Sequence, residues 1–232
     1  MLEAVIFDLG DTLISSERAL EDARDRQFEA IREEGYELSR EKYEELCEKT
    51  SEIYDKKYWG DENRHNPRNF MEVFFDVWDK EASEEEMERI GKAFIEGFVE
   101  NMELIPGAHE VLKFCESKGL YLALISNGRK EYIMKLLSEF DLGDYFETVL
   151  PSSEYGEKST LEPFKVFLGR TDFEPENCLM VGNRKDEDVH AKKLGMETVW
   201  IDRGREEVGK ELEPDFRIEN LEELKGIIET LL

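Results

Sequence analysis

Residues 3–15 read EAVIFDLGDTLIS, and this stretch decides the fold. It begins as a short apolar run of strand-forming residues and ends that run in a carboxylate, Asp8. Similar apolar runs recur at residues 120–126, 148–150, 178–182 and 197–201. Strands that are apolar almost throughout are typical of a parallel sheet that is covered on both faces.

Helix-like segments lie between these runs. They occupy residues 108–117, 130–140, 161–168 and 187–194. A final helix is expected from Asn220, because Glu223 lies three residues further on, as in a capping box. Since strand and helix alternate, the sequence predicts an α/β fold built as a doubly wound parallel sheet.

One segment breaks this alternation. From residue 16 to residue 102 no strand pattern appears, and dense Glu, Lys and Arg with regularly spaced apolar residues indicate three or four helices. Ser83 and Glu86 have the spacing of a capping box, and a break between helices is expected at residues 60–67. We therefore expect a core domain from residues 1–15 and 103–232, and a helical domain from residues 16–102.

Composition restricts the class of protein. The chain has 232 residues and a formal net charge of −26, so neither nucleic acid nor an anionic membrane is expected as a partner. No secretory signal and no apolar stretch of about 18 residues is apparent. The three cysteines form neither a disulfide framework nor a zinc spacing, which favours a cytoplasmic location. Abundant Lys and Glu with a single glutamine are typical of heat-adapted proteins.

Polar residues follow the apolar runs where the predicted strands end. Active sites of open parallel sheets form at this edge. Each residue alone is ordinary turn or cap chemistry, but together they can hold a divalent metal and an anion. Oxygen ligands favour Mg²⁺ over zinc. The set consists of Asp8, Asp11, Ser126, Asn127, Lys158, Asn183, Asp186 and Asp188.

Four motifs in these positions resemble those of the haloacid dehalogenase (HAD) superfamily. The first motif, D-x-D-x-T, corresponds to DLGDT at residues 8–12, and the second, a strand that ends in Ser or Thr, corresponds to LISNG at residues 124–128. The third motif is a Lys before a helix, here Lys158. The fourth, G-D-x-x-x-x-D, corresponds to GNRKDED at residues 182–188. The resemblance covers residues 3–15 and about 105–230. It also implies that the helical insert is a cap domain on a HAD-like core.

The resemblance implies a Mg²⁺-dependent phosphatase that hydrolyses a small phosphorylated metabolite through an aspartyl-phosphate on Asp8. The implied catalytic residues are Asp8, Ser126 and Lys158, with Asp11 as a further candidate; the implied substrate-binding residues are Thr12, Asn127 and Gly128; and the implied metal ligands are Asp8, the Gly10 carbonyl, Asn183 and Asp188.

Two positions depart from the family pattern. Gly10 stands where the family's phosphatases carry an Asp that serves as general acid and base, and a positioned proton-transfer group contributes roughly 10²–10⁴ in rate. Asp11 lies one position later and is the candidate substitute. Asn183 stands where a metal-binding Asp is usual; its carbonyl oxygen can still bind Mg²⁺, with less charge.

Two alternatives stay open on these departures. A metal-independent 2-haloacid dehalogenase would use the same Asp nucleophile, and those relatives also lack the second Asp and carry Ser-Asn-Gly. A catalytically weak binding protein with the HAD fold would account for both Gly10 and Asn183. In the cap, Trp59 beside Gly60 is the aromatic residue expected to contact the substrate, whereas the other aromatics are expected to form the cap's own core. The chain is expected to be a monomer or a homodimer.

Overall fold

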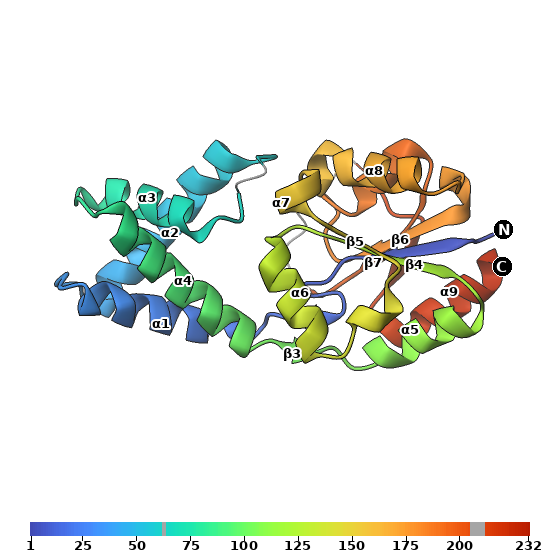
Figure 1. Cartoon of the computed structure of the whole chain (residues 1–232), viewed down its shortest axis with the longest axis horizontal. Helices are drawn as coiled ribbons and strands as arrows, with labels where there is room; N and C mark the ends of the chain where they lie inside the picture. Colours follow the sequence, from blue (N-terminus) through green and yellow to red (C-terminus); the bar gives the residue numbers. More distant parts are fainter. Residues whose placement is uncertain (62–63, 205–211) are drawn as a thin grey trace. The chain divides into compact units, whose positions relative to one another are not determined.

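The first apolar run forms a central strand of a six-stranded parallel sheet, in a computed structural model that describes residues 1–61, 64–204 and 212–232 (Figure 1). The order of strands across the sheet is β5-β4-β1-β6-β7-β8. The strands are β1 (Ala4–Phe7), β4 (Tyr121–Ser126), β5 (Thr148–Pro151), β6 (Cys178–Gly182), β7 (Glu197–Ile201) and β8 (Phe216–Ile218). The predicted parallel α/β sheet is confirmed.

The register of β1 brings the ends of three strands together. Phe7 pairs with Leu124 of β4 on one side and with Val181 of β6 on the other. The backbone N–H of Asp8 donates to the carbonyl of Val181 at 2.9 Å. The residues that follow β1, β4 and β6 therefore leave the sheet at the same edge, as parallel strands require.

Helices cover both faces of this sheet (Figure 1). They are α5 (Ala108–Ser117), α6 (Lys130–Glu139), α7 (Ser152–Tyr155), α8 (Glu162–Arg170) and α9 (Leu224–Leu231). Figure 1 shows α7 and α8 on one side of the sheet and α5 and α9 on the other. On the α8 side, Phe164 and Phe167 pack against Ile6, Ile125 and Met180. Burial of these side chains from both sides makes the sheet doubly wound.

Three details of the core differ from the sequence-based expectations. The helix expected at residues 187–194 is a 3-10 helix, η4 (Val189–Leu194), and it starts later because the chain first turns: the Asp188 N–H donates to the Arg184 carbonyl at 2.8 Å. The helix expected from Asn220 begins as the 3-10 turn η5 (Leu221–Glu223) before α9, with the predicted capping box present. The strands β2 (Ile14–Ser15), β3 (Glu103–Leu104) and β8 were not predicted.

Residues Ser16–Met102 form a second compact unit, separate from the unit of Met1–Ser15 and Glu103–Leu232. It contains α1 (Ala19–Glu33), α2 (Arg40–Tyr58), α3 (Pro67–Trp78) and α4 (Glu84–Glu100). The predicted capping box at the start of α4 is confirmed, because the Glu86 N–H donates to Ser83 Oγ at 3.2 Å and the Ser83 N–H donates to Glu86 Oε2 at 2.6 Å. This inserted unit is the cap.

Most aromatic side chains of the cap pack within it. Tyr54 lies 5.4 Å from Phe70 between ring centroids, and its hydroxyl donates to the Arg64 carbonyl at 2.6 Å. Trp59 is the exception, since 45% of its surface is exposed, with the Arg64 guanidinium 4.5 Å from its ring centroid. Residues 62 and 63 of the expected break between α2 and α3 lie outside the described residues.

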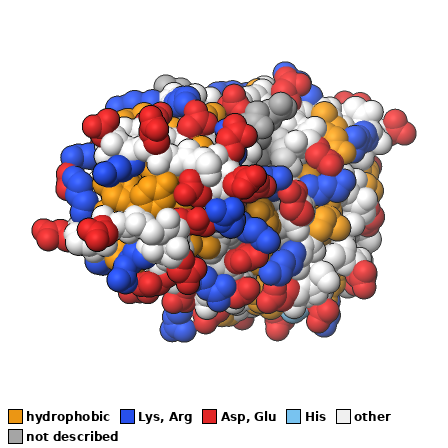
Figure 2. Space-filling model, turned by 60° about the vertical axis from the view of Figure 1, so that its left-hand side comes forward, with side chains coloured by type: hydrophobic (Ala, Val, Ile, Leu, Met, Phe, Trp, Pro, Cys, Tyr) orange, Lys and Arg blue, Asp and Glu red, His pale blue; other side chains and the backbone are white. Residues whose placement is uncertain are grey.

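Charged side chains of both signs lie close together over the face of the molecule shown in Figure 2. Ion pairs with partly or largely exposed side chains include Lys49 with Glu45 and Arg89 with Glu34. Where the structure describes the chain, no helix combines the length and apolar character needed to cross a membrane.

Candidate active site

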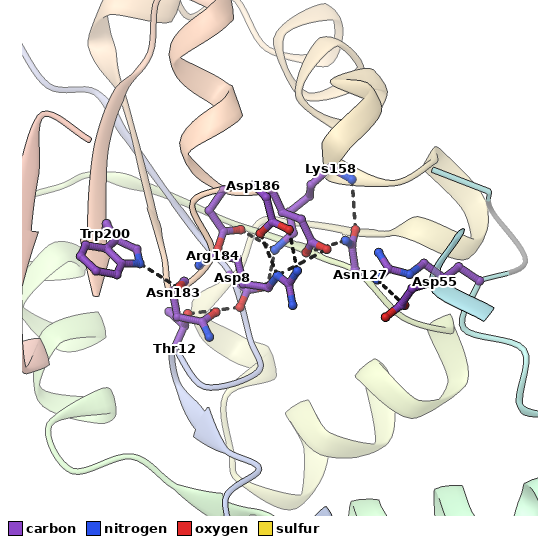
Figure 3. A network of polar contacts seen from close by, with 12 residues as sticks. Asp8, Thr12, Asp55, Asn127, Lys158, Asn183, Arg184, Asp186 and Trp200 are labelled. Atoms are coloured by element: carbon purple, nitrogen blue, oxygen red, sulfur yellow. Dashed lines mark hydrogen bonds and ion pairs between the residues drawn. The ribbon is translucent and has the colours of Figure 1, made fainter. Parts of the chain in front are cut away.

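Asp8 is the central carboxylate at the sheet edge (Figure 3). Its position directly after β1 leaves it only 4% exposed. One oxygen accepts from the Lys158 ammonium at 2.6 Å, and the other accepts from the Thr12 hydroxyl at 3.1 Å. Burial raises the pKa of Asp8 to about 6 against the opposing effect of Lys158, so the carboxyl is mainly ionised at neutral pH.

Lys158 supplies the positive charge that compensates two buried carboxylates. Its ammonium lies 2.6 Å from Asp8 Oδ1 and 2.5 Å from Asp188 Oδ1. The three side chains are nearly inaccessible, at 6% exposure or less. Burial alone would lower the pKa of Lys158, but the neighbouring carboxylates, that of Asp188 first, raise it above its ordinary value. The ammonium therefore stays charged.

Asp188 reaches this position because Gly182 has no side chain. A Cβ on Gly182, the last residue of β6, would lie 2.1 Å from Asp188 Oδ2. The same oxygen accepts from the Arg184 N–H at 2.9 Å, which closes the turn between β6 and η4. The glycine of the fourth motif thus allows the carboxylate to fold back against the strand end.

The first loop is held by contacts from elsewhere in the core unit. Thr12 is fully buried, and Asp11 has a left-handed backbone with φ of 56°. Arg203, which follows β7, donates through Nε to the Asp11 carbonyl at 2.9 Å. A Cβ on Gly10 would meet nothing within 4 Å, so this position has room for a side chain.

Asn127, which follows β4, connects two loops. Its Nδ2 donates to the Glu187 carboxylate at 2.8 Å, and its Oδ1 accepts from the backbone N–H of Lys158 at 3.1 Å. Ser126 ends β4 and is 5% exposed. The Gly128 N–H donates to Ser152 Oγ at 2.9 Å.

The fourth-motif loop carries a second group of polar contacts (Figure 3). The Trp200 indole N–H donates to the Asn183 carbonyl at 2.9 Å. Arg184 binds the Asp186 carboxylate through two nitrogens, at 3.1 and 2.6 Å. The carboxylate of Asp186, a member of the polar set predicted at the strand ends, is engaged by this guanidinium.

The oxygen donors at this edge fit Mg²⁺. Across residues 1–61, 64–204 and 212–232, no cluster of three or more His, Cys, Asp or Glu side chains suits a metal. Mg²⁺ needs no such cluster, because it is commonly bound by one or two carboxylates together with water and substrate phosphate. The carboxylates of Asp8 and Asp188 converge on one ammonium, and their two negative charges exceed its single positive charge. The Gly10 carbonyl and the Asn183 amide are further oxygen donors of the type that Mg²⁺ prefers.

The structure joins five of the predicted site residues by hydrogen bonds within the core unit. Asp8, Thr12, Asn127, Lys158 and Asp188 form one hydrogen-bonded set. Trp59 belongs to the cap unit.

Sequence reasoning assigned no role to several residues that hold the site together. They are Arg184, Glu187, Trp200 and Arg203. Two of them, Arg184 and Glu187, lie in the fourth motif at residues 182–188, but their contacts depend on how separate loops meet.

Comparisons with known proteins identify the family and relatives of this chain. The model for haloacid dehalogenase-like hydrolases matches residues 5–201. A ribulose-1,5-bisphosphate 5-phosphatase of Halopiger xanaduensis is 25% identical, covering 98% of this chain and 100% of the relative. A glyceraldehyde 3-phosphate phosphatase of Methanocaldococcus jannaschii is 28% identical, covering 100% and 99%.

A solved structure supports the fold. The magnesium-bound HAD-hydrolase YfnB of Bacillus subtilis superposes with a TM-score of 0.74 over 98% of both chains, at 18% identity. Because the family match runs over most of the chain and includes the loops that carry Asp8, Lys158 and Asp188, the chain belongs to the haloacid dehalogenase-like hydrolases.

Proposed function

We propose that this hydrolase is a Mg²⁺-dependent phosphatase of a small phosphorylated metabolite, with Asp8 as the nucleophile. The observation that carries the proposal is the buried Asp8 carboxylate, which is oriented by Thr12 on one oxygen and by Lys158 on the other. Two relatives that align over the whole chain are named as phosphatases of three- and five-carbon sugar phosphates, which supports this class of substrate.

The proposed chemistry uses the charges at the sheet edge. An Asp8 oxygen attacks phosphorus, the bond from phosphorus to the leaving oxygen breaks, and an aspartyl-phosphate forms. Water then attacks phosphorus and releases Asp8 as a carboxylate. Lys158 neutralises charge on Asp8 and on the phosphoryl oxygens, while Ser126, Asn127 and Gly128 are proposed to bind the remaining oxygens.

The metal is proposed to be held by Asp8, the Gly10 carbonyl, Asn183 and Asp188. When bound, it supplies positive charge that offsets the phosphate's negative charge. An amide at Asn183 in place of a carboxylate predicts weaker metal binding than a four-oxygen set with three carboxylates.

Proton transfer is the step at which this chain differs from its family's pattern. Position 10 carries no side chain, and we propose Asp11 as the group that takes over this role. Gly10→Asp tests the idea, because a side chain at position 10 meets no atom within 4 Å of its Cβ. If Asp11 serves poorly, Gly10→Asp raises turnover of alkyl phosphates by up to roughly 10²–10⁴-fold. An Asp11→Asn variant with unchanged kinetics would remove Asp11 from the mechanism.

Substrate selection is proposed to involve the cap. Trp59 is exposed and its ring is covered on one side by Arg64. We expect Trp59→Ala to change the KM for phosphorylated metabolites, measured across a panel that includes glyceraldehyde 3-phosphate and ribulose 1,5-bisphosphate. An unchanged kinetic profile over that panel would contradict a role in selection.

The decisive experiment is hydrolysis of para-nitrophenyl phosphate in Mg²⁺ and in EDTA, by the wild type and by Asp8→Asn. We expect Mg²⁺-dependent release of phosphate that is lost in Asp8→Asn. Full activity in that variant, or no turnover in Mg²⁺ of this ester or of the metabolite panel, would reject the phosphatase.

A further inference from the structure

The side chain of Asn127 bridges two loops that are distant in the sequence (Figure 3). Its Nδ2 contacts Glu187, which follows β6, and its Oδ1 contacts the backbone of Lys158, which follows β5 and α7. The Lys158 ammonium in turn lies 2.6 Å from Asp8. Glu187 is therefore linked to the proposed nucleophile through the two hydrogen bonds of Asn127, the side chain of Lys158 and the contact of its ammonium with Asp8.

Glu187 decides which way the Asn127 amide points. An ionised carboxylate only accepts hydrogen bonds, so it requires the Nδ2 end of the amide. The Oδ1 end is then directed to the Lys158 N–H, which only donates. Reversal of the amide would place two acceptors together at one end and two donors at the other. The anion at position 187 thus selects the single orientation that anchors Lys158.

The surroundings of Glu187 suit a residue that orients the Asn127 amide better than they suit a solvated surface charge. The residue is 5% exposed, and Arg184 Nε lies 3.5 Å from its other oxygen. Burying a carboxylate is unfavourable unless charge partners and hydrogen bonds compensate. The Asn127 amide and the Arg184 guanidinium provide both.

We propose that Glu187 is a positioning residue: it fixes the Asn127 amide, and the amide holds Lys158 against Asp8. The kinetic consequence rests on the proposed function, whereas the structural consequence does not. Displacement of a catalytic group by about 1 Å can reduce the rate by roughly 100-fold. Loss of the carboxylate at position 187 is therefore expected to slow the chemical step more than it weakens substrate binding.

Four variants test the kinetic consequence with para-nitrophenyl phosphate: Glu187→Ala, Glu187→Gln, Asn127→Ala and the double variant. Glu187→Ala is expected to lower kcat by about 10- to 100-fold with little change in KM. Glu187→Gln is expected to recover most of this loss, because its amide oxygen still accepts from Nδ2. The double variant is expected to be no slower than Asn127→Ala alone, because Glu187 acts through that amide. Glu229→Ala, which removes an exposed carboxylate of α9, serves as the control with unchanged kinetics.

Hydrogen exchange of the Lys158 backbone amide, measured by NMR, tests the structural consequence without turnover. Exchange is expected to speed up in Glu187→Ala and Asn127→Ala and to stay unchanged in Glu229→Ala. Unchanged exchange in Glu187→Ala overturns the inference, as does a double variant whose loss equals the product of the single losses. If Glu187→Ala does not fold, the same comparison is made with Glu187→Gln, which must then show slower exchange than Asn127→Ala. If wild-type turnover is absent or survives Asp8→Asn, the phosphatase proposal fails and hydrogen exchange alone decides the role of Glu187.

Discussion

Two lysine–carboxylate pairs, one in each unit, have nearly equal N···O distances in opposite surroundings. In the core, Lys158 lies 2.6 Å from Asp8, and both side chains are at most 6% exposed. In the cap, Lys49 lies 2.5 Å from Glu45, with side chains 57% and 46% exposed. Water and salt screen the cap pair, so its short distance contributes little to stability. Distance alone therefore does not measure what an ion pair does.

The core charges are buried for a reason other than stability. A sheet edge filled with apolar side chains would be at least as stable, since desolvation of ions can outweigh their attraction. Two carboxylates on one ammonium also leave a net negative charge that a divalent cation can neutralise. The cap, in contrast, owes its stability to its apolar cluster around Tyr43, Phe74 and Ile90. The same residue types thus face water in the cap, whereas in the core they are buried in the site for which we propose catalysis.

Lys158→Met is expected to give the largest effect, because it leaves Asp8 and Asp188 buried beside each other without a cation. Removal of one partner from a buried ion pair typically costs about 3–5 kcal/mol. We expect the free energy of unfolding, from urea denaturation at pH 7, to fall by that amount and turnover to be lost. The matched variant Lys49→Met in the cap should leave both almost unchanged. Equal losses of stability in the two variants would show that burial does not separate the two pairs.

Gly182→Ala is expected to have a smaller effect on stability, through displacement rather than loss of a charge. The added Cβ would lie 2.1 Å from Asp188 Oδ2, so the carboxylate must move away from Lys158. Overpacking of this kind costs about 1–3 kcal/mol, and phosphatase turnover should fall with it.

Gly226→Ala is the control for that substitution. Gly226 lies in α9, where an added Cβ meets nothing within 4 Å, so alanine should stabilise the protein by roughly 0.5–1 kcal/mol. If both glycine variants had the same melting temperature, the close approach of Asp188 to β6 would not contribute to the stability of the protein.

Local signals were enough to predict most of the core fold. The apolar runs at residues 178–182 and 197–201 have the observed bounds of β6 and β7, and residues 108–117 those of α5. Strand β8 gave no such signal, because Phe216–Ile218 is three residues long, has the exposed Arg217 at its centre and is defined by its pairing with β7.

The part of the candidate site that could be predicted is the part formed by residues that follow the carboxyl ends of the parallel strands. Asp8 and Lys158 are 150 residues apart in sequence, yet the parallel topology alone placed them at one edge. Glu187 was not predictable, because it stands in the charged stretch NRKDED and resembles a solvated residue. Its burial arises only when the loop after β6 meets Asn127. Contacts between loops depend on side-chain reach, which spacing along the chain does not encode.

Asp215 provides the intermediate case between the two pairs and the smallest expected effect. Its carboxylate accepts from the Thr198 N–H at 3.0 Å and from the Thr198 hydroxyl at 2.8 Å, and it also pairs with Lys192. Burial would raise its pKa, but the hydrogen bonds and charge of these partners hold the pKa below the ordinary value of 3.8. A lowered folded-state pKa means that the ionised carboxylate stabilises the fold above the ordinary value and loses this contribution as the pH falls through the folded-state pKa.

Asp215→Asn should therefore lower the melting temperature slightly at pH 7, and the difference from wild type should shrink as the pH falls towards 3. The cap pair Lys49–Glu45 and the buried Lys158 cluster mark the two limits between which this change should lie. The difference in melting temperature between the variant and the wild type could instead stay constant from pH 7 to pH 3. Asparagine alters the hydrogen-bond geometry at every pH, so a constant difference would show that this geometry contributes more to stability than the charge of Asp215. The contribution of a charge would then depend on its hydrogen-bond partners even where it is only partly removed from water.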